Sequence, residues 1–281
     1  MHSSPPIPGY DLIERLGGGP LTSVYSARDI ATGELCAVKL LRPDWQDQPT
    51  AVKLLQREAR TGLIVRHPHL VRFLFAHVTR PPYFLVMEML NGESLRRRLR
   101  RDKRLDVTTV LWIARQCAEA LTALHKLGFL HGDIKPDNVR LCEDGRAILI
   151  DLGFAHRPGE NAHLLKRGYV LGTVDYLAPE LCAFDEETDT CSDLFSLGIT
   201  LFEMLTGQLP YPHGTIEQTL RRHSSEPPTD IRSLVEGLPP GLMNLIDRLQ
   251  ARRPEDRPRA SLLVQQLMAL ESATGSRRLS A

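Results

Sequence analysis

The chain lacks long apolar runs, an excess of either charge and a paired set of cysteines. No apolar run approaches the roughly 18 residues that a membrane-spanning helix needs. A formal net charge of +1 gives no overall field toward nucleic acid or a membrane surface. The five cysteines are scattered and odd in number, which argues against a disulfide framework and against a zinc site. We therefore expect no nucleic acid partner, no membrane segment in this chain and a reducing, cytoplasmic setting.

A secretory signal core is also lacking, because the N-terminal residues are rich in Pro and Ser. We interpret residues 1–9 as an N-terminal extension. The remaining composition is that of an ordinary globular protein, with 42% hydrophobic and 25% charged residues. A length of 281 residues allows one bilobal domain or two small domains.

The first part of the chain is predicted to be rich in strands. Short runs separated by turn residues predict strands over residues 10–16, 24–28, 35–41, 73–75 and 83–89. Apolar residues at spacings of three and four predict one helix over 51–65. Alternation along the third strand places Ala37 and Lys39 on one face, which suggests a face that lines a cleft.

The rest of the chain is predicted to be mostly helical. Apolar stripes predict helices over residues 110–124, 194–205, 242–250 and 260–270. The sequence therefore predicts an α+β protein with a strand-rich lobe over 10–88, a hinge over 88–92 and a larger helical lobe over 93–270. Residues 271–281 are polar, and we expect them to form a disordered tail.

Two features of the first lobe suggest a phosphate site. Glycines at 17–19 lie between two predicted strands, where backbone amides can approach phosphate oxygens without side-chain clash. By itself such a glycine-rich hairpin is more often only a turn. Lys39 on the next strand needs a partner if it is buried, and Glu58 on the predicted helix can supply it. An exposed strand lysine is the alternative.

Two acidic loops follow in the second lobe. Asp133, Lys135 and Asn138 lie within six residues, and this combination suits a base, a phosphate contact and a metal ligand in phosphoryl transfer. Asp151 ends an apolar run and precedes Leu152-Gly153, where its carboxylate is placed to hold Mg²⁺. Either loop alone reads equally well as an ordinary turn. Both loops after a glycine-rich segment and a strand lysine form a far more specific pattern.

In this order, and with Ala178-Pro179-Glu180, Asp193 and Arg257 downstream, residues 10–270 resemble a Hanks-type serine/threonine protein kinase of the bacterial kind. The resemblance implies a small antiparallel sheet with one main helix above a larger helical lobe. It also implies direct transfer of the γ-phosphoryl group of ATP, with Mg²⁺ or alternatively Mn²⁺, to protein substrates. Lys135, two residues after the acidic residue, favours serine and threonine over tyrosine as acceptors.

The resemblance also implies roles for single residues. Asp133 would accept the proton of the substrate hydroxyl or orient it, and Lys135 would contact the γ-phosphate. Lys39 would hold the α- and β-phosphates and pair with Glu58. The metal ligands would be Asn138 and Asp151. Glu180 and Arg257 would form a buried structural ion pair.

The nucleotide site implied by the resemblance draws on both lobes. Met87 would be the gatekeeper side chain, and the backbone of the next two residues would hold the adenine edge. Glu93 would meet the ribose or a basic substrate residue. The full set is Leu16, Gly17, Gly18, Gly19, Thr22, Val24, Ala37, Lys39, Met87, Glu88, Met89, Glu93 and Arg140.

The sequence departs from the family pattern in the nucleotide site. Thr22 stands where a third glycine is usual, and Pro20 removes one amide donor, so we expect a stiffer loop that binds phosphate less well. Arg140 replaces an aliphatic residue under the adenine ring, and we expect its stem to pack there while its charged end reaches solvent. Leu152 in place of Phe is a mild apolar exchange.

A further departure concerns regulation. Gly132 replaces the Arg that in the family receives a phosphorylated activation loop, and no Ser or Thr lies between Asp151 and Gly172. We therefore expect activity without activation-loop phosphorylation. Tyr169 and Thr173 are the remaining hydroxyl groups, and we expect Thr173 to bond near Asp133.

Two other functions compete with an active protein kinase. A pseudokinase scaffold is suggested by Pro20, Thr22 and Arg140, although a scaffold need not keep every polar group of the site. A small-molecule phosphotransferase of the aminoglycoside type also uses His-Gly-Asp with a downstream Asn. The basic run over residues 96–104 is interpreted as a solvated helix face, or alternatively as a docking site for an acidic partner or nucleic acid. The oligomeric state and the physiological substrate are open.

Overall fold

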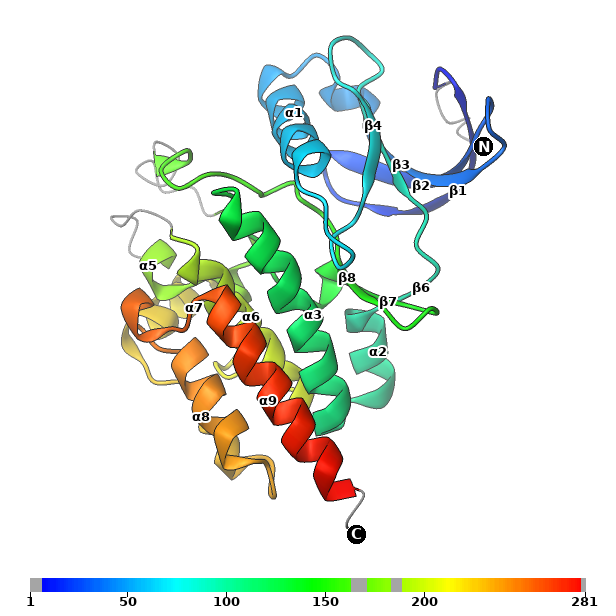
Figure 1. The fold of residues 1–281 in the computed structure, drawn as a ribbon. Helices are drawn as coiled ribbons and strands as arrows, with labels where there is room; N and C mark the ends of the chain where they lie inside the picture. The colour runs from blue at the N-terminus through cyan, green and yellow to red at the C-terminus, as the bar shows by residue number, and fades with distance from the viewer. Residues whose placement is uncertain (1–6, 163–170, 183–188, 279–281) are drawn as a thin grey trace.

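The computed structural model describes residues 7–162, 171–182 and 189–278. Two lobes are stacked, with a sheet and one long helix in the upper lobe and helices in the lower lobe (Figure 1). This arrangement confirms the predicted α+β, bilobal fold. Most of the expected N-terminal extension and Tyr169 lie outside the described residues.

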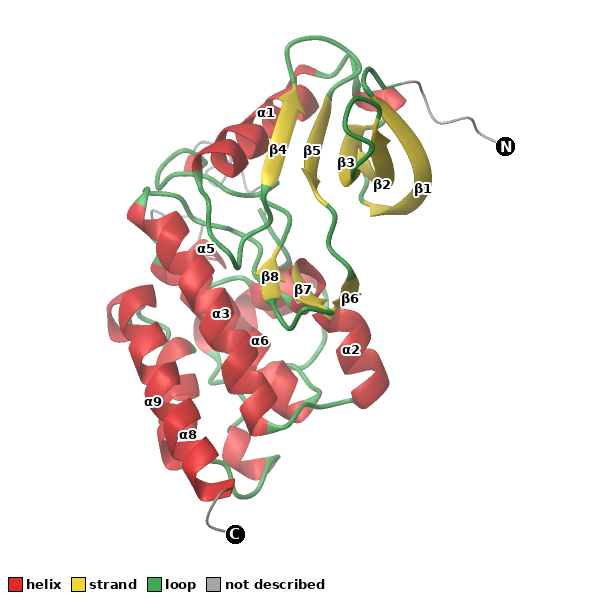
Figure 2. Ribbon diagram, turned by 45° about the vertical axis from the view of Figure 1, so that its right-hand side comes forward, coloured by secondary structure: helices red, strands yellow, loops and turns green. Residues whose placement is uncertain are grey.

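The upper lobe is a five-stranded antiparallel sheet in the order β1-β2-β3-β5-β4. Its strands are β1 (Tyr10–Gly18), β2 (Thr22–Asp29), β3 (Leu35–Leu41), β4 (Phe73–His77) and β5 (Phe84–Glu88). Strand β3 is central and buries six of its seven residues, which explains its near-continuous apolar sequence. Helix α1 (Pro49–Ile64) lies beside β4 (Figure 2) and turns Leu55, Glu58 and Ala59 inward.

A second, three-stranded sheet joins the two lobes at the hinge. It consists of β6 (Gly92–Ser94), β7 (Val139–Cys142) and β8 (Ala147–Leu149), with β7 in the middle. Val71, which precedes β4, donates its N–H to the carbonyl of Leu149 at 2.9 Å. The hinge and the segments around Asp133 and Asp151 are therefore fixed to one another by backbone hydrogen bonds.

Seven helices are described in the lower lobe. They are α2 (Leu95–Asp102), α3 (Val107–Lys126), α5 (Pro179–Cys182), α6 (Cys191–Thr206), α7 (Ile216–Ser225), α8 (Pro240–Leu249) and α9 (Ala260–Arg278). Helix α6 buries fourteen of its sixteen residues, which confirms the buried helix predicted from its apolar run. Among the described residues, no helix has both the length and the apolar character needed to cross a membrane.

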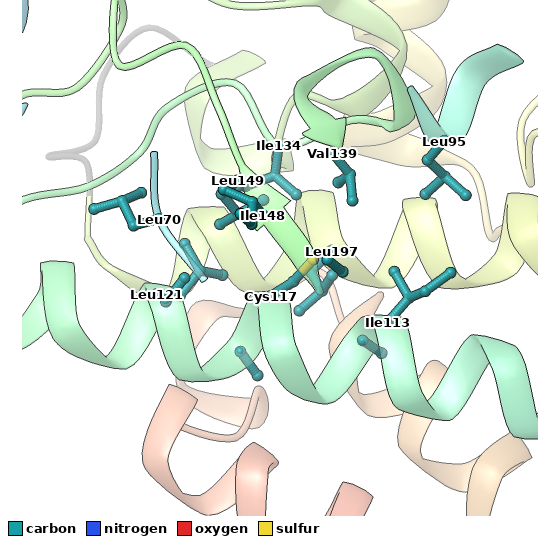
Figure 3. Close-up of a cluster of buried hydrophobic side chains, with 14 of the residues drawn as sticks. Leu70, Leu95, Ile113, Cys117, Leu121, Ile134, Val139, Ile148, Leu149 and Leu197 are labelled. Atoms are coloured by element: carbon teal, nitrogen blue, oxygen red, sulfur yellow. The ribbon is translucent and has the colours of Figure 1, made fainter. Parts of the chain in front are cut away.

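The core lies directly beneath the predicted catalytic segment. Figure 3 shows Ile134, Val139 and Leu149 above the side chains of α3, with Leu197 of α6 beside them. All four of these side chains are fully buried. Because close-packed interiors resist displacement, the polar residues between Ile134 and Leu149 are carried by a rigid support.

The expected disordered tail is wrong for residues 271–278, because α9 continues to Arg278. Glu271 pairs with Arg115 of α3, with 2.8 Å between Oε2 and Nε. The polar composition that suggested disorder belongs instead to the end of a helix that pairs with α3 through Glu271. A packed helix is stabilised by tertiary contacts, which a local composition does not reveal.

Candidate active site

The carboxylate of Asp133, in the segment after α3, is contacted by three polar side chains. Asp133 Oδ1 accepts a hydrogen bond from Thr173 Oγ1 at 2.7 Å. Asp133 Oδ2 lies 2.7 Å from Lys135 Nζ and accepts from Asn138 Nδ2 at 2.9 Å. The Asp133 side chain is 3% exposed, so these contacts fix the orientation of its carboxylate. Thr173 bonds to Asp133 as the sequence predicted, and it also accepts from Lys135.

The backbone that carries Asp133 is fixed by a second buried carboxylate, that of Asp193 on α6. It accepts from the backbone N–H groups of His131 at 2.8 Å and Gly132 at 2.9 Å, and His125 contacts it at 2.8 Å. Gly132 has φ +78°, and a Cβ there would lie 2.7 Å from the carbonyl oxygen of Phe154. Glycine at 132 therefore fits both the backbone conformation and the available space.

Lys39 of β3 connects the upper lobe to the lower lobe. Its Nζ lies 2.8 Å from Glu58 Oε1 on α1 and 2.7 Å from Asp151 Oδ1. Burial alone would lower the pKa of Lys39, but the carboxylates of Asp151 and Glu58 outweigh it and raise the pKa. The amine therefore stays charged, and the predicted Lys39–Glu58 pair is present.

Asp151 lies two residues beyond β8 in a strained backbone conformation, with φ +64°. The charge of Lys39 and a hydrogen bond from the Gly153 N–H lower its pKa to about 2. Asn138 donates from its amide nitrogen to both the backbone and the side chain of Asp133, which leaves Oδ1 of Asn138 as the atom able to act as a ligand. An ionised carboxylate and an amide oxygen form a donor set that fits Mg²⁺.

The glycine-rich segment covers a cavity of about 240 Å³ between the lobes. Gly18 has φ +141°, and a Cβ there would lie 2.4 Å from the Thr22 carbonyl oxygen, so this turn requires glycine. Val24 faces Lys39 across the β2–β3 register. The cavity is lined by residues that include Gly19, Thr22, Lys39, Glu58, Asp151 and Gly153.

Most of the remaining residues predicted to bind the nucleotide lie in β3, in β5 or near the hinge. Ala37 and Met87 are cross-strand partners, and both are buried. Arg140 differs from the expectation, because its guanidinium turns to the hinge and donates to the Leu90 carbonyl at 3.3 Å. Glu93 is bound by Arg101 of α2, with 3.0 Å between Oε1 and Nη2. The other members of the set are the exposed Leu16, Gly17 near the end of β1, Glu88 at the end of β5 and Met89 directly after it.

The opposite side of Asp133 adjoins an apolar cavity of about 30 Å³ lined by residues that include Ile134, Thr173, Tyr176, Leu177 and Leu181. The segment behind this cavity is held by an ion pair between Glu180 and Arg257. Its two nitrogen–oxygen distances are 2.7 and 2.8 Å, and both side chains are at most 2% exposed. The ion pair inferred from the resemblance is therefore present as a structural contact.

Two arginine clusters near the site were missed by sequence reasoning. Arg96 of α2 contacts Asp137, Glu203 and Tyr176. Arg57 and Arg60 of α1 contact Glu160, which lies nine residues after Asp151. The partners are separated by 41 to 107 residues. Charged residues at such separations carry no local pattern that could have signalled these contacts.

The comparisons with known proteins agree with this geometry. A profile of the protein kinase domain matches residues 10–268. Serine/threonine-protein kinase PknD of Mycobacterium tuberculosis is 33% identical over 249 residues, which cover 88% of this chain and 37% of PknD. Serine/threonine-protein kinase pkn2 of Myxococcus xanthus is 33% identical over 280 residues, covering 94% of this chain and 32% of pkn2.

Serine/threonine-protein kinase PknA of Mycobacterium tuberculosis is 30% identical over 256 residues, covering 89% of this chain and 58% of PknA. The chain thus spans between about a third and somewhat over half of the length of these relatives. The match to the profile and the identity to these relatives confirm the resemblance drawn from the motifs. The chain belongs to the protein kinase domain family and is similar to the Hanks-type serine/threonine protein kinases of bacteria.

Proposed function

We propose that this domain transfers the γ-phosphoryl group of ATP directly to Ser or Thr hydroxyls of cytoplasmic proteins, without a phospho-enzyme intermediate. The observation that carries the proposal is the contact of Lys39 with both Glu58 and Asp151. Asp133 is contacted by Lys135 in the same structure, which supports a phosphoryl-transfer site with residues from both lobes.

In the proposed mechanism the protein acts mainly by positioning and charge. The buried carboxylate of Asp133 orients the acceptor hydroxyl and takes up its proton. Lys135 contacts the transferred group, while Lys39 holds the non-transferred phosphates. Asp151 and Asn138 would hold Mg²⁺, which when bound neutralises phosphate charge.

The competing functions are less well supported by the same residues. The buried carboxylate of Asp133 is contacted by Thr173, Lys135 and Asn138. A protein that served only as a scaffold would not require this arrangement. A small-molecule phosphotransferase would not require the buried pair Glu180–Arg257 behind the acceptor-side cavity. These features favour an extended protein acceptor over a small one.

Labelling with γ-labelled ATP and Mg²⁺ tests the proposal. We expect label on Ser and Thr of a generic basic protein or of the domain itself, identified by phosphoamino-acid analysis. An aminoglycoside serves as the parallel acceptor. Label on the aminoglycoside alone, or no label on any protein acceptor from a folded sample that binds ATP, would contradict the proposed protein kinase.

Phosphatase treatment is predicted to leave the kinase active. Between Asp151 and Gly172 the sequence carries no Ser or Thr, and Gly132 offers no side chain to receive a phosphate. We expect the initial rate after complete dephosphorylation, checked by mass spectrometry, to stay within about twofold of the untreated rate. A loss of tenfold or more that ATP preincubation reverses would show that phosphorylation is required.

Replacing Thr22 with Gly is predicted to lower the KM for ATP by about threefold or more, because a more flexible loop brings its amides closer to the phosphates. Thr22 lines the cavity, and its carbonyl accepts the Gly19 N–H at 3.0 Å. Thr32→Gly, in the exposed turn after β2, is the matched control. An unchanged KM in Thr22→Gly contradicts this explanation of the departure.

A further inference from the structure

A carboxylate from the segment after Asp151 lies between two arginines of α1. Glu160 Oε1 is 3.1 Å from Arg60 Nη2 and 3.4 Å from Arg57 Nε. The second oxygen, Oε2, accepts from the Arg157 backbone N–H at 3.0 Å. The neighbouring Asn161 accepts from Arg57 Nη1 at 2.7 Å, so the segment is bound to α1 at two successive residues.

The two arginines flank the residue that pairs with Lys39. Arg57 directly precedes Glu58 in α1, and Arg60 follows two positions later. A helix moves as a rigid body over one turn, so an anchor on Arg57 and Arg60 also sets the position of Glu58. The contact with Glu160 therefore bears directly on whether Glu58 reaches Lys39.

The site around Glu160 is built from both lobes. The guanidinium of Arg60 lies 5.6 Å from the centre of the Phe129 ring, and that of Arg157 lies 4.9 Å from it. Phe129 is 1% exposed and follows α3 in the lower lobe. The Glu160 side chain itself is 25% exposed. Burial would raise its pKa, but the Arg157 N–H and the two α1 arginines outweigh this effect and lower it.

The carboxylate of Glu160 supplies the negative charge opposite Arg57 and Arg60 without any modification. Gly132 has no side chain, and the segment from Asp151 to Gly172 has no Ser or Thr to phosphorylate. A fixed carboxylate opposite two guanidinium groups needs no modification to be charged.

We propose that Glu160 is a positioning residue: its permanent negative charge holds α1 where Glu58 pairs with Lys39. This inference rests on the proposed phosphoryl transfer and explains how the transfer proceeds without activation-loop phosphorylation. Glu160 acts through α1 and does not itself contact the reacting groups.

The test compares Glu160→Gln, which removes the charge but keeps the shape, with the conservative Glu160→Asp. We expect kcat to fall about tenfold in Glu160→Gln and to stay within about threefold in Glu160→Asp. Glu271→Gln is the matched control, because Glu271 also joins two distant elements through an Arg at similar exposure. Thermal unfolding of all three variants checks that each one folds.

A double-mutant cycle separates positioning from general stability. If Glu160 acts through Glu58, Glu160→Gln will cause little further loss in a Glu58→Gln background. Equal losses in both backgrounds, or a kcat in Glu160→Gln equal to that of wild type, overturn the proposal.

Hydrogen exchange gives a readout that does not depend on activity. Amides of α1 (Pro49–Ile64) should exchange faster in Glu160→Gln than in wild type, and Glu271→Gln should leave them unchanged. Unchanged exchange of the α1 amides in Glu160→Gln contradicts the inference even if the kinase is active. If the α1 amides exchange faster in Glu160→Gln but the wild-type protein transfers no phosphate, Glu160 does hold α1 in place and only the proposed function is contradicted.

Discussion

Replacing Asp133 with Asn will lower kcat by about a hundredfold to ten-thousandfold, while the protein stays folded and still binds ATP. Asn keeps the size of the side chain and one oxygen that can accept from Thr173 Oγ1. It removes the negative charge that faces Lys135 and that would take up the hydroxyl proton. Initial rates at saturating ATP and acceptor measure the effect.

Asp144→Asn is the matched control for this substitution. Asp144 lies in the turn between β7 and β8, pairs with Arg146 and is exposed. We expect wild-type rates from Asp144→Asn and an unchanged unfolding temperature from both variants. If Asp133→Asn retains more than about a third of the wild-type kcat, Asp133 is not the catalytic carboxylate.

Replacing Glu180 with Ala will lower the free energy of unfolding by about 3–5 kcal/mol, because it leaves the charge of Arg257 buried without a partner. Arg257 is fully buried at its side chain and contacts both oxygens of Glu180. Its other hydrogen bonds go to backbone carbonyls, including that of Ala251 at 2.8 Å, and its guanidinium lies 5.1 Å from the centre of the Phe195 ring; none of these partners neutralises the charge. The expected fall in unfolding temperature is roughly 6–20 °C.

Two comparisons make this stability prediction specific. Glu180→Leu combined with Arg257→Met removes both charges, and we expect it to lose less stability than Glu180→Ala alone. Glu255→Ala removes an exposed pair with Arg253 and should barely change the unfolding temperature. An unfolding temperature for Glu180→Ala within 2 °C of wild type, about the shift expected from one half to one kcal/mol, would rule out an uncompensated buried charge.

The elements best predicted from the sequence are those whose pattern is set by burial. Strand β3 matches its predicted bounds, since residues 35–41 are almost uninterruptedly apolar and the strand is buried on both faces. Helix α6 was predicted from its apolar run for the same reason. The end of α9 was missed, because its last residues are polar and the contact of Glu271 with Arg115 of α3 leaves no local pattern in the sequence.

In the candidate site, contacts between residues close in the sequence could be predicted, and contacts between distant residues could not. Asp133, Lys135 and Asn138 lie within six residues, so their grouping around one carboxylate follows from a short loop. The contact of Lys39 with Asp151 joins residues 112 positions apart. The resemblance assigned both residues to the same site, but only the folded chain brings them within 2.7 Å.

By itself the sequence predicted the two-lobed α+β fold, the order of the motifs and the candidate residues for the chemistry. These properties follow from local apolar patterns and from residue types at short spacings. Only the tertiary structure decided that Gly132 adopts a left-handed backbone conformation, that Arg140 turns to the hinge and that Glu160 lies between Arg57 and Arg60. The physical reason is that each of these depends on the packing of segments far apart in the chain, and charged residues on such segments find their partners only after the lobes have packed.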